Sequence, residues 1–419
     1  MGGVLEVPRL SGALARASHS SESVRESEDE AATIIPLKIC DLTQFYSPLS
    51  GGVKRYVHEK INYIQTKSPE DEHILIIPGA KTEVIAGDRS RIYSIHSPLV
   101  SRSSRYRLLL NLCAIAEIVE RERPDIIESG DPYQVGWKAI SVGRSLGIPV
   151  VGFYHSHFPE AYLRGPARFL RTAAQKYVRK LYNRFEATLV PSEQLARVLE
   201  DWGVRNVRTV NLGVNTGTFS PHPDDGAETR GSLGIALDRK LLLYVGRLAQ
   251  EKNTETLFAS FEMLAKRRPD EFELLIIGDG PQREQRRQLQ AQTGNMKWIQ
   301  YCTDSLELAR FYRAADLFVH PGIQETFGLV ALESQACGTP VAGIRGSYMD
   351  RIIFHEQESW AGQNTPEALA DAIEEFSGKD LKSLGATAAR VAAERYSWPR
   401  VFEGLLCIYR EVCANYRQH

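Results

Sequence analysis

Two glutamates separated by a short apolar run are the residues whose types and spacing point most directly to chemistry. Glu325 and Glu333 lie within the run from His320 to Gly338. Thr326 is placed to cap a helix that begins at Phe327, and the N-terminus of a helix attracts an anion. Seven residues of helix advance about 10 Å, so Glu333 is expected along the side of the helix and Glu325 at its mouth. A ligand with hydroxyl groups at both ends and a diphosphate between them suits this layout.

The groups expected to bind that diphosphate are backbone N–H groups and two cations. The N–H groups belong to Phe327, Gly328 and Leu329. Arg247 follows the strand-like run LLLYVG, and Lys252 comes five residues later, just before a predicted helix. An arginine at such a turn offers a bidentate fork to a diphosphate, and a lysine offers a point charge.

A second glycine turn follows the next apolar run, FELLIIG. It reads Gly278-Asp279-Gly280-Pro281, and glycines in such a turn let the backbone approach a flat ligand. The pattern is not GxGxxG, so it does not predict a dinucleotide site.

Parallel strands are expected to position these residues. The rest of the chain shows the alternation of apolar and amphipathic stretches that is typical of such strands. From Leu37 onward, short apolar runs alternate with amphipathic stretches, and the strand-like runs of the first half are LKICDL, HILIIP, DIIES, PVVGFY and ATLVP. Alternation of this kind is typical of an α/β fold with a parallel sheet covered on both faces. It restarts at Lys240 after a Gly- and Pro-rich stretch, which predicts two similar units.

The predicted domains follow from these changes in pattern. Residues 1–33 are rich in Ser, Glu and Arg and are expected to be a disordered tail. Residues 34–213 form the first unit and residues 214–398 the second. The last helix, 399–419, opens at Ser397-Trp398-Pro399, where a proline near the first helical position is favourable.

Composition excludes several classes of protein. The 419 residues carry a formal net charge of −1, so no basic excess indicates nucleic acid as a partner. Six scattered cysteines match no metal-ligand spacing, and reduced thiols in the cytoplasm are the expected state. No stretch approaches 18 uncharged apolar residues, so no membrane-spanning helix is expected.

Five motifs in order resemble one family. They are GRL…EK at Gly246 to Lys252, GDGP at Gly278 to Pro281, LARFYRAADLFVHPG at Leu308 to Gly322, the Glu325/Glu333 pair, and ACGTPV at Ala336 to Val341. Together they resemble the C-terminal half of the retaining glycosyltransferases of family 4, which have the two-domain GT-B fold. The chain departs from the family pattern in the loops Tyr301 to Asp304 and Arg345 to Asp350, which lie near the nucleotide or the sugar in that family.

The resemblance implies roles for the candidate residues. The donor would be a UDP- or GDP-sugar bound without a metal or other cofactor, since no Asp-x-Asp pair is present. Glu325 would accept hydrogen bonds from the sugar hydroxyls and Glu333 from the ribose. Gly51 and Gly52 would form a loop over the donor from the opposing domain. A hexose would move to a hydroxyl acceptor, with a lipid or polysaccharide precursor as the working hypothesis.

Two histidines follow the strand-like run that ends at Phe153. The resemblance assigns His155 to contact with the transferred sugar, and His157 is the second candidate. A metal pair would need further ligands that are not found nearby.

A basic stretch lies between Tyr162 and Phe185. It predicts an amphipathic helix for which two interpretations stay open: an apolar stripe facing the core with a solvated basic side, or peripheral contact with an anionic membrane.

Two functions from other classes also stay open. A sugar-nucleotide epimerase with the same two-domain build would bind the same donor but would use no second substrate. A binding protein with a silent active site is the other alternative, and the presence of Arg247, Lys252, Glu325 and Glu333 argues against it.

Overall fold

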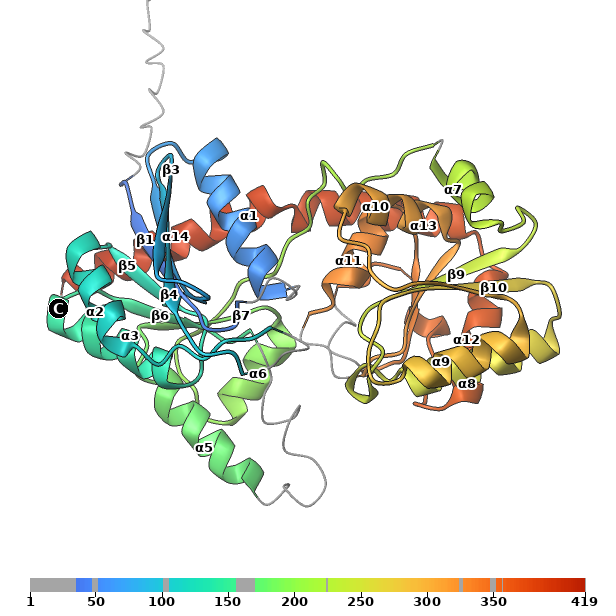
Figure 1. The fold of residues 1–419 in the computed structure, drawn as a ribbon, viewed down its shortest axis with the longest axis horizontal. Helices are drawn as coiled ribbons and strands as arrows, with labels where there is room; N and C mark the ends of the chain where they lie inside the picture. Colours follow the sequence, from blue (N-terminus) through green and yellow to red (C-terminus); the bar gives the residue numbers. More distant parts are fainter. Residues whose placement is uncertain are drawn as a thin grey trace, which may run out of the picture. The chain divides into compact units, whose positions relative to one another are not determined.

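The structure is a computed structural model, and it describes residues 35–46, 52–100, 105–155, 170–223, 225–323, 327–346, 352–355 and 357–418. The predicted tail, residues 1–33, lies outside these ranges, as do Gly51, His157, Glu325 and Thr326. Within the described ranges the chain forms one sheet of eight strands and one of five (Figure 1). The predicted α/β class with two parallel-sheet units is therefore confirmed.

The first sheet has the strand order β3-β4-β2-β1-β5-β6-β7-β8. Its strands are β1 Lys38–Leu42, β2 Glu72–Gly79, β3 Glu83–Gly87, β4 Ser90–His96, β5 Ile126–Ser129, β6 Val150–Phe153, β7 Ala187–Val190 and β8 Val207–Thr209. All neighbouring strands are parallel except β3 and β4. The five predicted strands are confirmed as β1, β2, β5, β6 and β7. The hairpin strand β3 was not predicted, because all its side chains are exposed and it carries no buried run.

Helices cover both faces of this sheet because its strands alternate. Ile39 of β1 belongs to the core cluster that includes Tyr56 and Ile64, whereas the next residue, Cys40, belongs to the cluster that includes Ile115 and Ile140. The first pair comes from α1 and the second from α2 and α3. The helices of this unit are α1 Gly52–Lys67, α2 Leu112–Glu122, α3 Gln134–Leu146, α5 Arg171–Tyr182 and α6 Glu193–Asp201.

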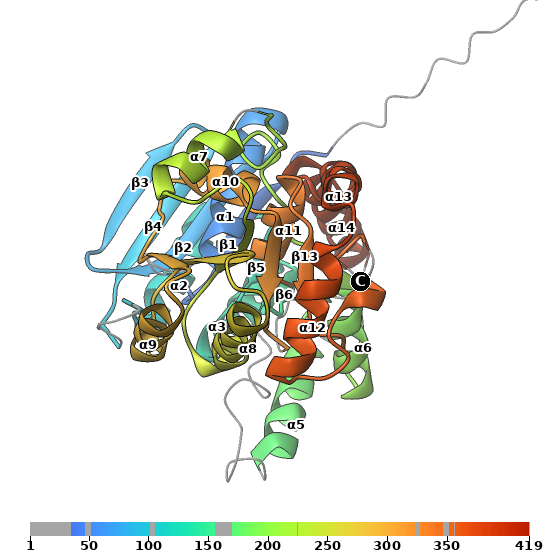
Figure 2. The ribbon, with the colours of Figure 1, turned by 90° about the vertical axis from the view of Figure 1, so that its right-hand side faces the viewer.

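The second sheet is wholly parallel and has the order β11-β10-β9-β12-β13. Its strands are β9 Lys240–Val245, β10 Phe272–Ile277, β11 Met296–Ile299, β12 Leu317–His320 and β13 Val341–Gly343. The α-helices that follow β8 are α7 Asp225–Leu233, α8 Thr254–Arg267, α9 Arg283–Thr293, α10 Ser305–Ala314, α11 Leu329–Ala336, α12 Pro366–Ser377, α13 Leu381–Tyr396 and α14 Trp398–Arg417. Helix α8 packs against both α9 and α12, and Figure 2 shows it between them.

The last helix, α14, begins after Ser397, as predicted, and it packs on α1. Its Tyr409 hydroxyl accepts a hydrogen bond of 3.0 Å from Lys60 of α1. Arg410 forms an ion pair of 2.9 Å with Asp71, which precedes β2. The end of the chain is therefore part of the first unit's core, and the domain limits at 213 and 398 stay a prediction.

Candidate donor site

The candidate donor site lies at the carboxyl edge of the second sheet. The strands β9, β10 and β12 are neighbours, and in an open parallel sheet ligands bind outside the carboxyl ends of the strands. A pocket of about 180 Å³ opens there. It is lined by Gly52, Leu212, Tyr244, Val245, Gly246, Lys252, His320, Phe327, Gly328, Leu329 and Val330. Five of the predicted site residues, Gly52, Lys252, Phe327, Gly328 and Leu329, are thus brought together.

The two predicted cations have different surroundings. Lys252 ends a short 3-10 helix, Gln250–Lys252, and lines the pocket. Asn253 follows it in a left-handed conformation and donates a hydrogen bond of 2.8 Å to the Pro321 carbonyl, which holds this turn against the end of β12. The Arg247 side chain is 61% exposed and forms an ion pair of 3.3 Å with Glu251. Lys252 is therefore the cation that the fold places at the pocket, whereas Arg247 lies at the surface beside it.

The helix at the pocket begins later than the sequence predicts. Helix α11 starts at Leu329, and its N-cap is Gly328, with φ of 87° and no side-chain cap bond. The N–H groups of Ala331 and Leu332 both bond to the Gly328 carbonyl. Capping by Thr326 with a start at Phe327 was wrong, because glycine at 328 tolerates a left-handed conformation that breaks the helix there. The N–H groups that precede the first intrahelical bonds are those of Leu329 and Val330, and Phe327 is a core residue that is 1% exposed.

The glycines of the second turn serve a contact between two backbone segments. Gly278 has φ of 145°, and a Cβ there would collide with the Gly246 carbonyl. A Cβ on Gly280 would collide with the Leu248 carbonyl. Neither Gly278 nor Gly280 lines the pocket, so in this structure their small size lets the turn after β10 pack against the turn after β9. Their predicted contact with the donor stays a prediction.

Glu333 is buried and already bonded. It is 2% exposed, accepts a hydrogen bond of 3.1 Å from the Tyr312 hydroxyl, and forms an ion pair with Arg55 of α1. A ribose hydroxyl would therefore have to share this carboxylate with Arg55 or displace it. Sequence reasoning missed Arg55, although it stands only three residues after the Gly51-Gly52 pair.

The described residue of the predicted histidine pair, His155, follows β6 and is half-buried. Its ring stacks on Phe153 at 4.0 Å between centroids and meets Tyr56 edge-on at 5.2 Å. Burial, and then the positive charge of Lys60, lower the pKa of His155 to about 3. The imidazole is therefore neutral at pH 7, which suits hydrogen bonding to a hydroxyl better than pairing with a phosphate.

A buried carboxyl group that sequence reasoning missed follows Gly130, the residue that packs against the His155 ring. Asp131 is fully buried, and its Oδ1 accepts a 2.7 Å hydrogen bond from the Tyr133 N–H. Among the described residues, its Oδ2 and the Ser129 hydroxyl have no hydrogen-bond partner. The residue between them, Gly130, packs so closely that a Cβ would lie 3.2 Å from the His155 ring. Burial raises the pKa of Asp131 to about 7.

Asp131 is expected to make the protein less stable as pH rises between 3.8, the ordinary pKa of the group, and about 7. In that window the folded state keeps a proton that the unfolded chain releases, so the free energy of unfolding falls with pH, by on the order of 3 kcal/mol for this group. Asp131→Asn should therefore lose less stability across the window than the parent protein. Urea unfolding at both ends of the window measures this, and equal losses in the two proteins would contradict it.

The described part of the chain contains neither a cluster of metal ligands nor a membrane-spanning helix. There, no group of three or more His, Cys, Asp or Glu residues is arranged to hold a metal ion. None of the helices described has the length and apolarity needed to cross a bilayer. Metal-independence stays a prediction.

Comparison with known proteins agrees with this geometry. Residues 50–218 match the model of Glycosyltransferase Family 4, and residues 225–389 match that of glycosyl transferases group 1. A GDP-mannose-dependent alpha-(1-6)-phosphatidylinositol dimannoside mannosyltransferase of Mycobacterium tuberculosis is 30% identical over 392 residues, which cover 91% of this chain and 98% of that protein. The sulfoquinovosyl transferase SQD2 of Arabidopsis thaliana is 30% identical over 300 residues, 70% of this chain but only 57% of that relative.

Among solved structures, sucrose-phosphate synthase from Thermosynechococcus elongatus superposes with a TM-score of 0.73. The sequences are 21% identical, and the match covers 90% of this chain and 100% of that one, so this likeness speaks for the fold alone. Two parallel-sheet units of this kind define the GT-B class of glycosyltransferases. The chain belongs to glycosyltransferase family 4, and it is a glycosyltransferase.

Proposed function

We propose that this enzyme transfers a hexose from a UDP- or GDP-sugar to a hydroxyl of a lipid or polysaccharide precursor with retention of the anomeric configuration. The observation that carries the proposal is the pocket at the carboxyl edge of the second sheet, where Lys252 and the N-terminus of α11 meet. GDP-mannose is the first donor to test, because the name of the relative that matches over 98% of its length specifies it.

The chemistry follows from where charge develops. During transfer the bond between the sugar C1 and the β-phosphate oxygen breaks, and a bond between C1 and the acceptor oxygen forms. Negative charge grows on the departing phosphate, which Lys252 and the N–H groups of Leu329 and Val330 stabilise. The acceptor proton passes to that phosphate oxygen, so attack and departure occur on one face of the sugar.

The remaining contacts with the sugar, the diphosphate and the ribose of the donor are assigned to residues of both units. Glu325, which lies outside the described residues, and the neutral ring of His155 hydrogen-bond to the sugar hydroxyls. Arg247 joins the diphosphate by exchanging Glu251 for the ligand. Gly51 and Gly52 cover the donor, and Glu333 accepts hydrogen bonds from the ribose hydroxyls.

The test is release of nucleoside diphosphate with and without acceptor. GDP-mannose and UDP-glucose are supplied in parallel with a mannosylated phosphatidylinositol extract, and the anomeric configuration of the product is read by NMR. Acceptor-dependent release with a retained α-linkage is the expected result. An inverted product overturns the retaining mechanism. Conversion of the donor without an acceptor would favour the epimerase alternative, which the named relatives, all transferases, do not support.

We further propose that the enzyme contacts the inner face of a membrane through the basic side of α5. Its residues Val178, Leu181 and Tyr182 are buried, while its basic residues Arg179 and Lys180 are exposed. This arrangement fits both interpretations of the basic stretch, since a helix packed on the core also leaves a cationic side outward. Residues 162–169 of that stretch lie outside the described ranges.

A further inference from the structure

Both oxygens of the Glu333 carboxylate have a partner in the structure. Its Oε2 accepts a hydrogen bond of 3.1 Å from the Tyr312 hydroxyl, and its Oε1 forms the ion pair with Arg55. Tyr312 is completely buried, so its ring has no room to turn away, whereas the Arg55 side chain is 33% exposed. Arg55 is therefore the partner that a ribose hydroxyl can displace from this carboxylate.

The ion pair belongs to a contact between the helices α1 and α11 that runs beside the donor pocket. At the start of both helices Gly52 faces Leu329, since a Cβ on Gly52 would lie 3.8 Å from the Leu329 side chain. One turn further along each helix, Arg55 meets Glu333. Gly52 and Leu329 both line the pocket. The ion pair thus lies one helical turn from the pocket wall, close to the end of the donor that carries the ribose.

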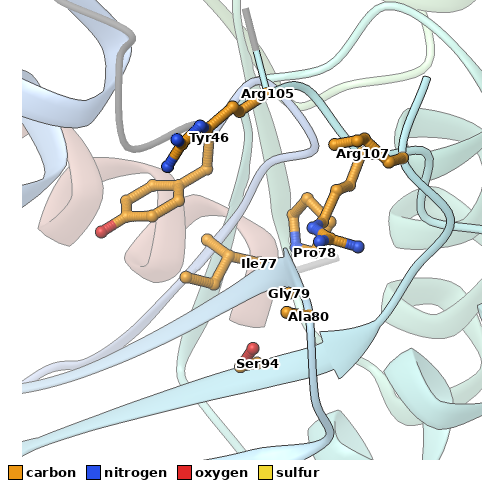
Figure 3. A pocket seen from close by; sticks show the side chains of 9 residues that line it. Tyr46, Ile77, Pro78, Gly79, Ala80, Ser94, Arg105 and Arg107 are labelled. Atoms are coloured by element: carbon orange, nitrogen blue, oxygen red, sulfur yellow. The ribbon is translucent and has the colours of Figure 1, made fainter. Parts of the chain in front are cut away.

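Helix α1 itself is held in place, so the movable part of this contact is the Arg55 side chain. Lys60 is buried and forms an ion pair of 2.9 Å with Asp41 of β1. The His58 ring is bonded at 2.7 Å to the hydroxyl of Tyr46, which lines a separate pocket of about 560 Å³ (Figure 3). These contacts fix the helix to the first unit, and release of the carboxylate therefore takes a rotation of Arg55 rather than a shift of α1.

A second acid is placed to receive the arginine once it leaves. Glu59 stands four residues after Arg55 in α1, and residues at this spacing lie on the same side of a helix. Burial raises the pKa of Glu59, and the hydrogen bond from Asn215 and the positive charge of Arg55 partly offset this shift. The Asn215 bond is long, at 3.5 Å. Arg55 therefore has two carboxylates within reach, Glu333 on α11 and Glu59 on its own helix.

We propose that Arg55 competes with the ribose of the nucleoside diphosphate for Glu333. Without nucleotide, Arg55 pairs with Glu333. When nucleotide binds, the ribose hydroxyls take the carboxylate and Arg55 turns to Glu59. Return of Arg55 to Glu333 then favours departure of the nucleoside diphosphate after transfer. The inference rests on the proposed transferase function and adds to it a residue that weakens nucleotide binding.

The experiment measures nucleotide binding by the full-length protein with isothermal titration calorimetry. GDP and UDP are titrated first, and the tighter ligand is compared with its 2′,3′-dideoxy form, which lacks the hydroxyls assigned to Glu333. The variants are Arg55→Met, Glu59→Gln and the double variant. Arg144→Met, on the exposed surface of α3 and outside the set of pocket-lining residues, is the control that removes the same side chain.

We expect Arg55→Met to bind the ribonucleotide about tenfold more tightly, which corresponds to a free carboxylate in about one molecule in ten of the parent protein. Arg144→Met should bind it as the parent does. The dideoxy nucleotide should bind all of these proteins with the same affinity. Glu59→Gln should weaken ribonucleotide binding by about twofold, the usual effect of an ion pair one turn apart on a helix, and should have no effect in the Arg55→Met background.

Unchanged or weaker ribonucleotide binding by Arg55→Met, at an unchanged melting temperature, overturns the proposal. An equal gain for the dideoxy nucleotide also overturns it, because the arginine would then act on a part of the ligand other than the ribose. If Arg55→Met does not fold, Arg55→Lys takes its place. That variant keeps the charge but loses the guanidinium fork, so it should still bind the ribonucleotide several-fold more tightly than the parent. Failure of both GDP and UDP to bind the parent protein would instead refute the proposed function, and the competition with it.

Discussion

Lys252→Ala is expected to lower kcat by about 10²–10³-fold, the usual effect of removing one group that stabilises charge in a transition state. Lys252 is the cation that the fold places in the donor pocket, next to the N-terminus of α11. Negative charge on the departing diphosphate is greatest in the transition state, so kcat should fall more than KM rises. The measurement is nucleoside diphosphate release at saturating donor and acceptor.

The control for this prediction is Lys266→Ala on α8, whose side chain is 74% exposed and pairs with Glu262. Both variants should keep the melting temperature of the parent protein, because neither side chain is part of the core. Arg247→Ala distinguishes the roles of the two cations: a comparable loss would mean that Arg247 leaves Glu251 when donor binds. If Lys252→Ala retains full kcat, the diphosphate is stabilised elsewhere and the assignment of this pocket fails.

Lys60→Met is expected to lower the free energy of unfolding by about 3–5 kcal/mol, the range found when one partner of a buried ion pair is removed. Lys60 is 1% exposed and forms ion pairs with Asp41 at 2.9 Å and Glu128 at 3.2 Å. Among the described residues, its loss leaves Asp41 with the His73 ring as its remaining ion-pair partner and leaves Glu128 without a cation. Burial, partly offset by Lys60, already raises the pKa of Glu128 to about 6, so the loss should shrink as the pH falls below that value.

Urea unfolding at pH 7 measures this effect. Lys67→Met, at the exposed end of the same helix α1, should change stability by no more than about 0.5 kcal/mol. Adding Glu128→Gln to Lys60→Met should restore part of the loss by removing the charge left without a cation. A loss in Lys60→Met no larger than in Lys67→Met would show that the buried cluster is not held by its lysine.

Much of the fold could be predicted because its signals are local. A buried parallel strand needs a continuous apolar run, and the runs at β1, β2, β9 and β10 are of that kind. The start of α14 could likewise be placed from a proline near its first turn. Strand β3 has no such run, and β8 has three residues, so neither could be recognised.

Sequence alone determined the family, the α/β class and the candidacy of Lys252 and the 327–329 segment, because residue types at short spacings carry those properties. Tertiary structure decided what the same residues face. The start of α11 at Leu329 depends on a left-handed glycine, the pairing of Glu333 with Arg55 joins residues 278 positions apart, and the burial of Lys60 needs a helix from the far end of the chain. Contacts of this kind depend on which distant segments pack together, and no local pattern of residues encodes that packing.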